Sequence, residues 1–543
     1  MRMTRPLRDL RWPALALVLT LGSFHCGAMD AESSDARAPG CSDGDCDGFG
    51  GTGGSGGGDG NDNEPEDELE SAFEAPVVTE KRVWAANPES GRVAIVDAST
   101  LEIRTIDAGF APTHLAAIPS RKEGEEQAIV LNVLSHDATL IRIDTAGEVE
   151  TTTAPVHEGA NAWSIGPHGR YAIAWTDARR VENPDPTEGF QDITVIDLAA
   201  SPPKATRLAV GYRPAQIVIN EAESRAFAIA EPGISVIALD GDAPSLVNLV
   251  EVNASNPAAT SSVDVTPDGT LAIVRHDGSE VVTVIDLVTS ERVDFTLSGP
   301  VTDLDLARDG SFALAVVRSP TPSGGEEATP GSQVVVLPLP DALEDPEAAL
   351  TLTLPNETVG SASLTDAGDV ALLYTNAVPS DRLVVVSLDT GTHRAISLKA
   401  PIKAVLPAPD SEHAVAILAP PTGSTKPGAF ALVPTKSTLP PRIQATEAPV
   451  LGVSIAPAPS HRALVVVRGE AGQEHAAYLA RLPQLQVDRV RLASPPLATG
   501  MAPAANMGFV AQEHPEGRLT FIDLENGAAR TVTGFELGTR VVD

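Results

Sequence analysis

Short apolar runs separated by turns recur from residue 81 to the end of the chain, with a period of roughly 46 residues. The clearest copy is Ser261–Pro300. A first strand ends at a Pro-Asp-Gly turn, a second strand follows, a third ends in Ile-Asp-Leu, and a fourth completes the unit. A period of this size is typical of stacked or circular arrays of small units. We therefore predict an all-β fold, a β-propeller of four-stranded blades.

The second strand of each unit is the most hydrophobic. Runs such as AIVLNVL, RYAIAWT, TLAIVRH and DVALLYT are apolar at successive positions, as expected when both faces of a blade pack against neighbours. Inner strands are predicted to begin at His114, Ala162, Gln216, Ser262, Asp303, Ser361, Ala404, Gly452 and Ala498. Aspartates near the ends of third strands are expected to bind the backbone of the next turn. They are Asp97, Asp144, Asp197, Asp240, Asp286, Asp389 and Asp523.

One segment carries a family resemblance. Val83–Asp97, with the sequence VWAANPESGRVAIVD, resembles the YVTN family of β-propeller repeats, in which an aromatic-led strand, an Asn-x-x-x-Gly turn and a Val-Ile-Asp strand recur. The likeness returns at Ser261–Asp286 and Arg518–Leu524. It implies a propeller of WD40-like repeats. It implies little about activity, because propellers include enzymes, scaffolds and binding modules.

The number of blades is the harder question. About ten units fit the chain, more than the four to eight blades typical of propellers. We expect one large ring; two smaller propellers in tandem, or insertions in place of degenerate blades, are the alternatives. The first unit, residues 82–109, shows no inner strand of its own, whereas Gly538–Asp543 is a spare strand at the end of the chain. We therefore expect this terminal strand to complete the first blade and close the ring.

The beginning of the chain predicts export. Four arginines among the first eleven residues precede an apolar stretch, Trp12–Phe24, that is too short to span a bilayer comfortably. Cys26 follows at the place where a bacterial lipoprotein is cleaved and lipidated, and residues 1–26 resemble that class of signal peptide. Ser23 and His25 depart from the usual pattern of this class, so cleavage without lipidation is the alternative.

Residues 27–77 are rich in Gly, Ser, Asp and Glu and contain few apolar side chains, so we predict a disordered tether before a propeller over residues 78–543. The only other cysteines, Cys41 and Cys46, lie in this tether and could form a disulfide in an oxidising compartment. The predicted location is the bacterial cell envelope, as an outer-membrane lipoprotein; a periplasmic or secreted protein is the alternative.

The net charge of the chain limits the classes of partner that it can bind. The formal net charge of -35 argues against nucleic acid, because phosphate binding needs clusters of Lys and Arg. We expect a protein or a surface polymer as partner, and contact with the membrane through the lipid anchor only.

Candidate chemistry is sought at the central channel, where the inner strands meet. The polar or aromatic candidates there are His114, Trp163, Gln216, Asp264, Asp303, Asp305 and Lys403. Asp264 and Asp305 occupy equivalent positions of consecutive units, so their carboxylates could hold a divalent cation, as in metal-dependent lactonases that share propeller folds. The other interpretation is that these acids bind neighbouring backbone. We assign no catalytic residue, no metal-ligand set and no cofactor.

Three long segments between second and third strands are candidates for a partner-binding rim. They are Arg179–Gln191, Ser319–Ser332 and Ala419–Gly428. Alternating strands place all such connections on one face of a propeller, although drift in exposed loops explains them equally well. The prediction is a non-enzymatic, envelope-anchored β-propeller that serves as a binding or assembly platform. The alternative is a periplasmic YVTN-like hydrolase or lactonase with a cation in the channel.

Overall fold

The computed structural model describes residues 75–252, 261–276, 278–317, 331–421, 423–469, 475–535 and 541–542. All described residues belong to one compact unit within Glu68–Asp543. The predicted signal peptide, Cys26, Cys41, Cys46 and nearly all of the predicted tether lie outside the described residues.

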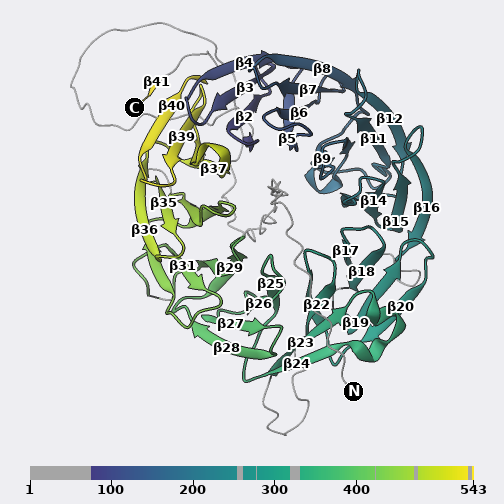
Figure 1. The fold of residues 1–543 in the computed structure, drawn as a ribbon, viewed down its shortest axis with the longest axis vertical. Helices are drawn as coiled ribbons and strands as arrows, with labels where there is room; N and C mark the ends of the chain where they lie inside the picture. The colour runs from purple at the N-terminus through teal and green to yellow at the C-terminus, as the bar shows by residue number, and fades with distance from the viewer. Residues whose placement is uncertain are drawn as a thin grey trace, which may run out of the picture. The chain divides into compact units, whose positions relative to one another are not determined.

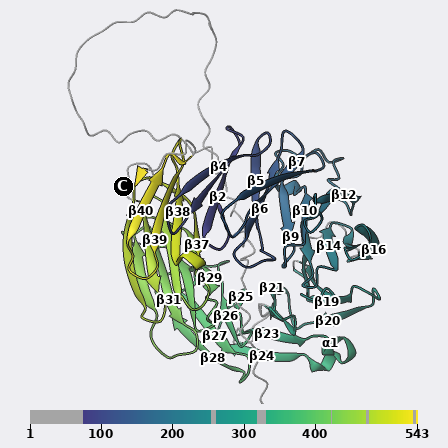
Figure 2. The same ribbon diagram turned by 45° about the horizontal axis from the view of Figure 1, so that its top comes forward.

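Ten antiparallel sheets follow one another in chain order as the blades of one propeller (Figure 1). The single large ring predicted from the repeat count is therefore confirmed. Each blade consists of four consecutive strands, and the tenth carries a fifth. Figure 2 shows the same blades in an oblique view, turned by 45° from Figure 1.

Each strand occupies one of four places in its blade, from the channel outward. The innermost strands are β1 (Val77–Val78), β5 (Pro112–Ile118), β9 (Ala162–Ile165), β13 (Gln216–Ile219), β17 (Ser261–Val265), β21 (Val301–Leu306), β25 (Ser361–Leu364), β29 (Ile402–Pro407), β33 (Val450–Ile455) and β37 (Pro496–Ala502). The second strands are β2 (Arg82–Asn87), β6 (Glu126–Asn132), β10 (Tyr171–Trp175), β14 (Arg225–Ala230), β18 (Leu271–His276), β22 (Phe312–Val317), β26 (Val370–Tyr374), β30 (His413–Leu418), β34 (Arg462–Val467) and β38 (Met507–Gln512).

The third strands are β3 (Arg92–Asp97), β7 (Asp137–Ile143), β11 (Asp192–Asp197), β15 (Gly233–Ala238), β19 (Val281–Asp286), β23 (Gly331–Pro338), β27 (Arg382–Ser387), β31 (Gly428–Pro434), β35 (His475–Arg481) and β39 (Arg518–Asp523). The outermost strands are β4 (Ile103–Asp107), β8 (Val149–Pro155), β12 (Lys204–Ala209), β16 (Ser245–Glu251), β20 (Arg292–Thr296), β24 (Leu350–Pro355), β28 (Thr392–Ser397), β32 (Arg442–Thr446), β36 (Gln486–Leu492) and β40 (Ala529–Thr533).

Few other elements are present in the described part. The helical segments there are η1 (Ala178–Arg180), α1 (Asp341–Glu344), η2 (Pro346–Ala348) and η3 (Pro503–Ala505), and β41 (Val541–Val542) is the additional strand of the last blade. None of the described helices is long and apolar enough to cross a membrane.

The core consists of the seams between blades. Along β26, Val370, Leu372 and Tyr374 pack toward blade 8. The alternate residues Ala371 and Leu373 pack toward blade 6. This period-two division explains why second strands are apolar throughout, since both faces of the strand are buried.

Apolar clusters of the same kind lie between every pair of consecutive blades. A further cluster joins the last blade to the first: Val83 and Ala85 of β2 pack with Phe509 of β38, Phe521 of β39 and Phe535. Blade 10 is thus sealed against blade 1 by buried apolar side chains, which closes the ring without an exchanged strand.

The predicted exchange of the terminal strand is wrong. Blade 1 has its own inner strand, because Val77 and Val78 of β1 pair with Trp84 and Val83 of β2. The carboxylate of Glu126 on β6 fixes the chain that follows β1 by accepting the backbone N–H groups of Lys81 and Arg82, each at 3.2 Å. The terminal strand β41 instead pairs with β40, the outermost strand of blade 10.

The predicted turn aspartates are confirmed at five of the seven positions. Backbone N–H groups of the following turn donate to the carboxylates of Asp97, Asp144, Asp197, Asp286 and Asp523. These acids therefore cap turns and do not form a functional ring.

Candidate functional site

All seven predicted channel residues lie on innermost strands. His114 is on β5, Trp163 on β9, Gln216 on β13, Asp264 on β17, Asp303 and Asp305 on β21, and Lys403 on β29. Gln216 and Lys403 are exposed, and the other five are partly buried. They belong to six different blades, so only the residues on adjacent strands can act together.

One register position on the inner strands recurs as a link between blades. It is the residue that pairs with the third residue of its own second strand, and in three blades it is a serine. Each serine hydroxyl donates to a backbone carbonyl in the inner strand of the next blade. The bonds run from Ser164 to Ile217 at 2.8 Å, from Ser363 to Val405 at 3.1 Å and from Ser454 to Thr499 at 3.0 Å. We call this position the latch position.

In blade 6 the latch position is occupied by Asp305, which pairs with Leu314. Its Oδ2 accepts the backbone N–H of Leu364 in blade 7 at 2.8 Å. Two residues earlier, Asp303 accepts the N–H of Ala362 at 2.8 Å. Burial raises the pKa of both carboxyls, and these backbone hydrogen bonds oppose the rise. Both side chains therefore bind the inner strand of blade 7.

Asp264 occupies the latch position of blade 5, where it pairs with Ile273. None of the hydrogen bonds found among the described residues joins its carboxyl to blade 6. Burial, then the negative charges of Asp305 and Asp303, raise the pKa of Asp264 to about 6, and Arg275 opposes this rise. Asp264 is thus the one of the three channel acids without a backbone partner in the described structure.

The proposed cation site has no ligand set in the described part of the chain. No three His, Cys, Asp or Glu side chains there converge in a way that could hold a metal ion. Asp303 and Asp305 also direct oxygens to backbone N–H groups, as the second interpretation of these acids predicts. The geometry therefore gives the lactonase alternative no specific support.

On the other side of the channel, Trp163 and His114 link blades 3 and 2. The indole Nε1 of Trp163 donates to the backbone oxygen of His114 at 2.9 Å. Burial and the nearby positive charge of Arg180 lower the pKa of His114 to about 4, so its imidazole is neutral at pH 7. Trp163 also packs beside the apolar cluster between blades 2 and 3, which makes a packing role the simplest one.

The first of the three predicted rim loops lies entirely within the described residues. The connection between β10 and β11 contains Arg179–Gln191 and is held by the segment that enters blade 4. The side chain of Arg213 donates to the carbonyl oxygens of Glu188 at 3.1 Å and Asp185 at 2.9 Å. The Tyr212 hydroxyl donates to Pro186 O at 2.6 Å. These contacts hold the loop against the segment between β12 and β13.

The other two predicted loops are less fully described. Ala419–Gly428 connects β30 to β31 as predicted, apart from residue 422. Most of Ser319–Ser332 lies outside the described residues.

Two exposed apolar side chains were not predicted. Both lie on the face of the propeller that carries the connections between second and third strands, which we call the loop face. Phe110 lies between β4 and β5 and is 74% exposed, and Leu134 lies between β6 and β7 and is 73% exposed. The backbone N–H of Leu134 donates to Phe110 O at 3.2 Å, so the two residues are adjacent. Connections from second to third strands and from one blade to the next lie on the same face of a propeller, so this pair shares the face of the Arg179–Gln191 loop. Apolar residues at turn positions were the available sequence signal.

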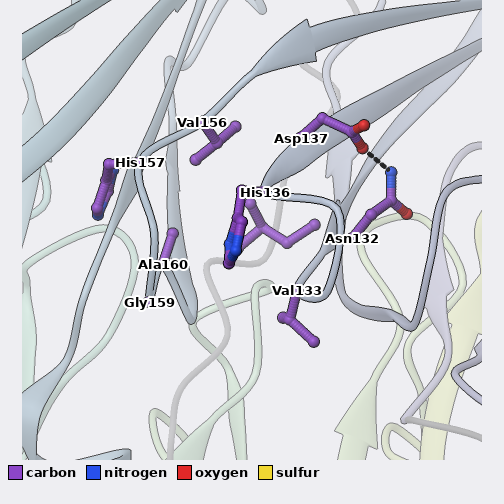
Figure 3. Close-up of a pocket in the computed structure, with 9 residues that line it drawn as sticks. Asn132, Val133, His136, Asp137, Val156, His157, Gly159 and Ala160 are labelled. Carbon is purple, nitrogen blue, oxygen red and sulfur yellow. Dashed lines mark hydrogen bonds between the residues drawn. The ribbon is translucent and has the colours of Figure 1, made fainter.

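A small hollow lies at the seam between blades 2 and 3 (Figure 3). Val133, His136 and His157 are among its lining residues. The ring nitrogens of His157 lie 3.0 Å from Thr194 Oγ1 and 3.4 Å from Thr176 Oγ1. Burial lowers the pKa of His157 to about 4, with a smaller contribution from Arg207. His157 is therefore a neutral, hydrogen-bonded core residue.

Comparisons with known proteins found distant likenesses to solved structures. No family model matches it, and no curated protein matches its sequence. A solved structure of the dihydro-haem d1 dehydrogenase NirN in complex with DHE is 14% identical, with a TM-score of 0.40, over 69% of this chain and 74% of that chain. A solved eukaryotic initiation factor is 12% identical, with a TM-score of 0.46, over 85% and 95%. The Cps50 (Swd1) β-propeller domain of Myceliophteria thermophila is 14% identical, with a TM-score of 0.34, over 58% and 95%. Likenesses this distant carry no argument about this chain.

Proposed function

We propose that this protein is a non-enzymatic, envelope-anchored β-propeller that binds a protein partner through its loop face, the face that carries Phe110, Leu134 and the Arg179–Gln191 loop. The observation that carries the proposal is the adjacent pair Phe110 and Leu134, which is about three-quarters exposed and fixed by backbone contact. Exposed apolar side chains on a rigid scaffold are favourable anchors for a protein, because burying them releases water without ordering a flexible loop.

The rest of the loop face fits the same role. The Arg179–Gln191 loop is fixed by Arg213 and Tyr212, so it presents polar groups in one arrangement. A surface with an apolar centre and an ordered polar rim is the usual anatomy of a protein interface. A surface polymer rich in hydroxyl groups would make less use of an aliphatic side chain such as that of Leu134.

The anchoring part of the proposal rests on the amino-terminal sequence. The lipoprotein-like segment that ends at Cys26 and the Gly-rich stretch after it would hold the propeller at the membrane with freedom to move. Metabolic labelling with a radioactive fatty acid tests this directly. The full chain should be labelled and the variant Cys26→Ser should not. An unlabelled full chain would refute the lipid anchor and favour a protein that is cleaved and released.

The binding part is tested with matched full-chain variants. Phe110→Ser and Leu134→Ser alter the loop face, and Leu439→Ser alters a 57% exposed leucine between β31 and β32, on the opposite face. Each variant is cross-linked in an envelope extract, and the adducts are quantified. We expect both loop-face variants to weaken a discrete protein adduct by about tenfold or more, while Leu439→Ser leaves it unchanged. Equal retention by all three variants, or adducts that contain only polymer, would refute the proposal.

A further inference from the structure

The latch position is filled differently in different seams of the ring. By the same register it holds an alanine, a valine, a leucine or a glycine in blades 2, 4, 8 and 10, and a serine or an aspartate in blades 3, 5, 6, 7 and 9. Among these five polar side chains, that of blade 5 is the exception. Serine donates to a carbonyl of the next blade in blades 3, 7 and 9. Asp305 accepts an N–H from the next blade in blade 6. Asp264 stands at the same position in blade 5, and none of the described hydrogen bonds connects it to blade 6.

Register identifies the atom that Asp264 would have to reach. Each carbonyl that accepts a serine latch belongs to the residue that pairs with the fourth residue of its second strand. The pairs are Ile217 with Ala228, Val405 with Ala416 and Thr499 with Val510. In blade 6 the residue at that place is Leu304, which pairs with Ala315.

The chemistry of this seam requires a donor. The N–H of Leu304 is already bound to Oδ1 of Asp303 at 3.0 Å, so the remaining backbone group of Leu304 for a latch is its carbonyl oxygen. An ionised carboxylate has no proton to donate to a carbonyl, whereas a neutral carboxyl has one.

We propose that Asp264 is a proton-dependent latch between blades 5 and 6. Its neutral carboxyl donates to the Leu304 carbonyl, and its ionised form leaves this part of the seam unlatched. The proton comes from solvent and returns to it, so no other reactant is needed.

The surroundings of Asp264 favour the neutral form. The charged groups that face it are Asp303 and Asp305 from β21 and Arg275 from its own blade. Arg275 is engaged with blade 6, since its Nη1 donates to Val301 O at 3.3 Å. With a pKa of about 6, the neutral share of Asp264 falls from about nine-tenths at pH 5 to a few hundredths at pH 7.5. Acid therefore closes the latch and neutral pH opens it.

The pH dependence of stability that Asp264 contributes is opposite in sign to the one that the buried histidines contribute. A raised carboxyl pKa adds stability as the pH falls through about 6. His114 and His157 have pKa values lowered to about 4, so they subtract stability over the same range, because the unfolded chain takes up their protons first. A change in overall stability with pH would mix the two effects, so the test must be local and must compare variants.

Hydrogen–deuterium exchange of the full chain at pH 5.0 and pH 7.5, with times scaled to the intrinsic exchange rate, provides this test. The readout is protection of peptides that cover β17 and β21. Asp264→Ser supplies a permanent donor of the kind used in blades 3, 7 and 9, and Asp264→Asn supplies one of the same size as the native side chain. Asp264→Ala supplies none. Glu291→Gln removes an exposed acid from the same blade and serves as the control.

We expect exchange at this seam in the native chain and in Glu291→Gln to be about tenfold faster at pH 7.5 than at pH 5.0. Asp264→Ser and Asp264→Asn should be protected at both pH values, and Asp264→Ala at neither. The proposal is overturned if the native chain exchanges equally at both pH values. It is also overturned if the pH dependence persists after Asp264 is replaced by Ala, or by both Ser and Asn.

Discussion

Replacing Asp305 tests whether its carboxylate has a structural role or serves as a ligand of a cation. Asp305→Ala removes the acceptor of the Leu364 N–H, a 2.8 Å hydrogen bond that joins blades 6 and 7. A hydrogen bond to a charged group contributes about 1.5–3 kcal/mol, so we expect the free energy of unfolding at pH 7.5 to fall by about 2 kcal/mol. Asp305→Asn keeps an acceptor oxygen at the same place and removes a charge that burial disfavours. Its loss should be below about 1 kcal/mol.

The assay is urea unfolding of the full chain, followed by tryptophan fluorescence, with and without a chelator. Ser363→Ala is the matched control, because it removes a neutral latch at the same register position in the next blade and should cost about 1 kcal/mol. The chelator should change none of the midpoints. The reasoning is refuted if Asp305→Asn is as destabilising as Asp305→Ala, or if chelation destabilises the native chain and not the Asp305 variants.

Two further predictions concern the loop face and the core. Arg213→Ala removes two side-chain hydrogen bonds that fix the Arg179–Gln191 loop. Limited proteolysis within that loop should therefore become about tenfold faster, while the urea midpoint stays within error of the native value. Unchanged cleavage would show that the loop is fixed by other contacts. The pKa of His157 is about 4, below its ordinary value. This residue therefore lowers the free energy of unfolding by about 2 kcal/mol at pH 5 relative to pH 7.5. His157→Gln should remove this part of the difference between urea midpoints at the two pH values, and a difference as large as that of the native chain would contradict the prediction.

The hydrophobic pattern was sufficient for the propeller and for most of its strands. Inner strands begin within two residues of the predicted positions, because each follows a turn rich in Pro or Gly and precedes an apolar second strand. The two ends of the ring were not predictable in the same way. Val77–Val78 is too short to show a pattern, and Val541–Val542 pairs with an outer edge that its sequence does not specify.

The candidate site was predicted in its location and only partly in its chemistry. The seven channel residues lie on inner strands because their place in the repeat determines their place in the blade. The partners of Asp303 and Asp305 are backbone atoms of the next blade, and that contact depends on the registers of two separate sheets. Phe110 and Leu134 were missed because exposure in a turn is a property of the folded surface and not of hydrophobicity.

The central functional claim is that the loop face binds a protein. Its most direct test is site-specific photocross-linking in intact cells, with benzoylphenylalanine placed at Phe110 in one full-length variant and at Leu439, on the opposite face, in another. We predict a discrete protein adduct from position 110 and none from position 439. The same adducts from both positions, or no protein adduct from position 110, would contradict the claim.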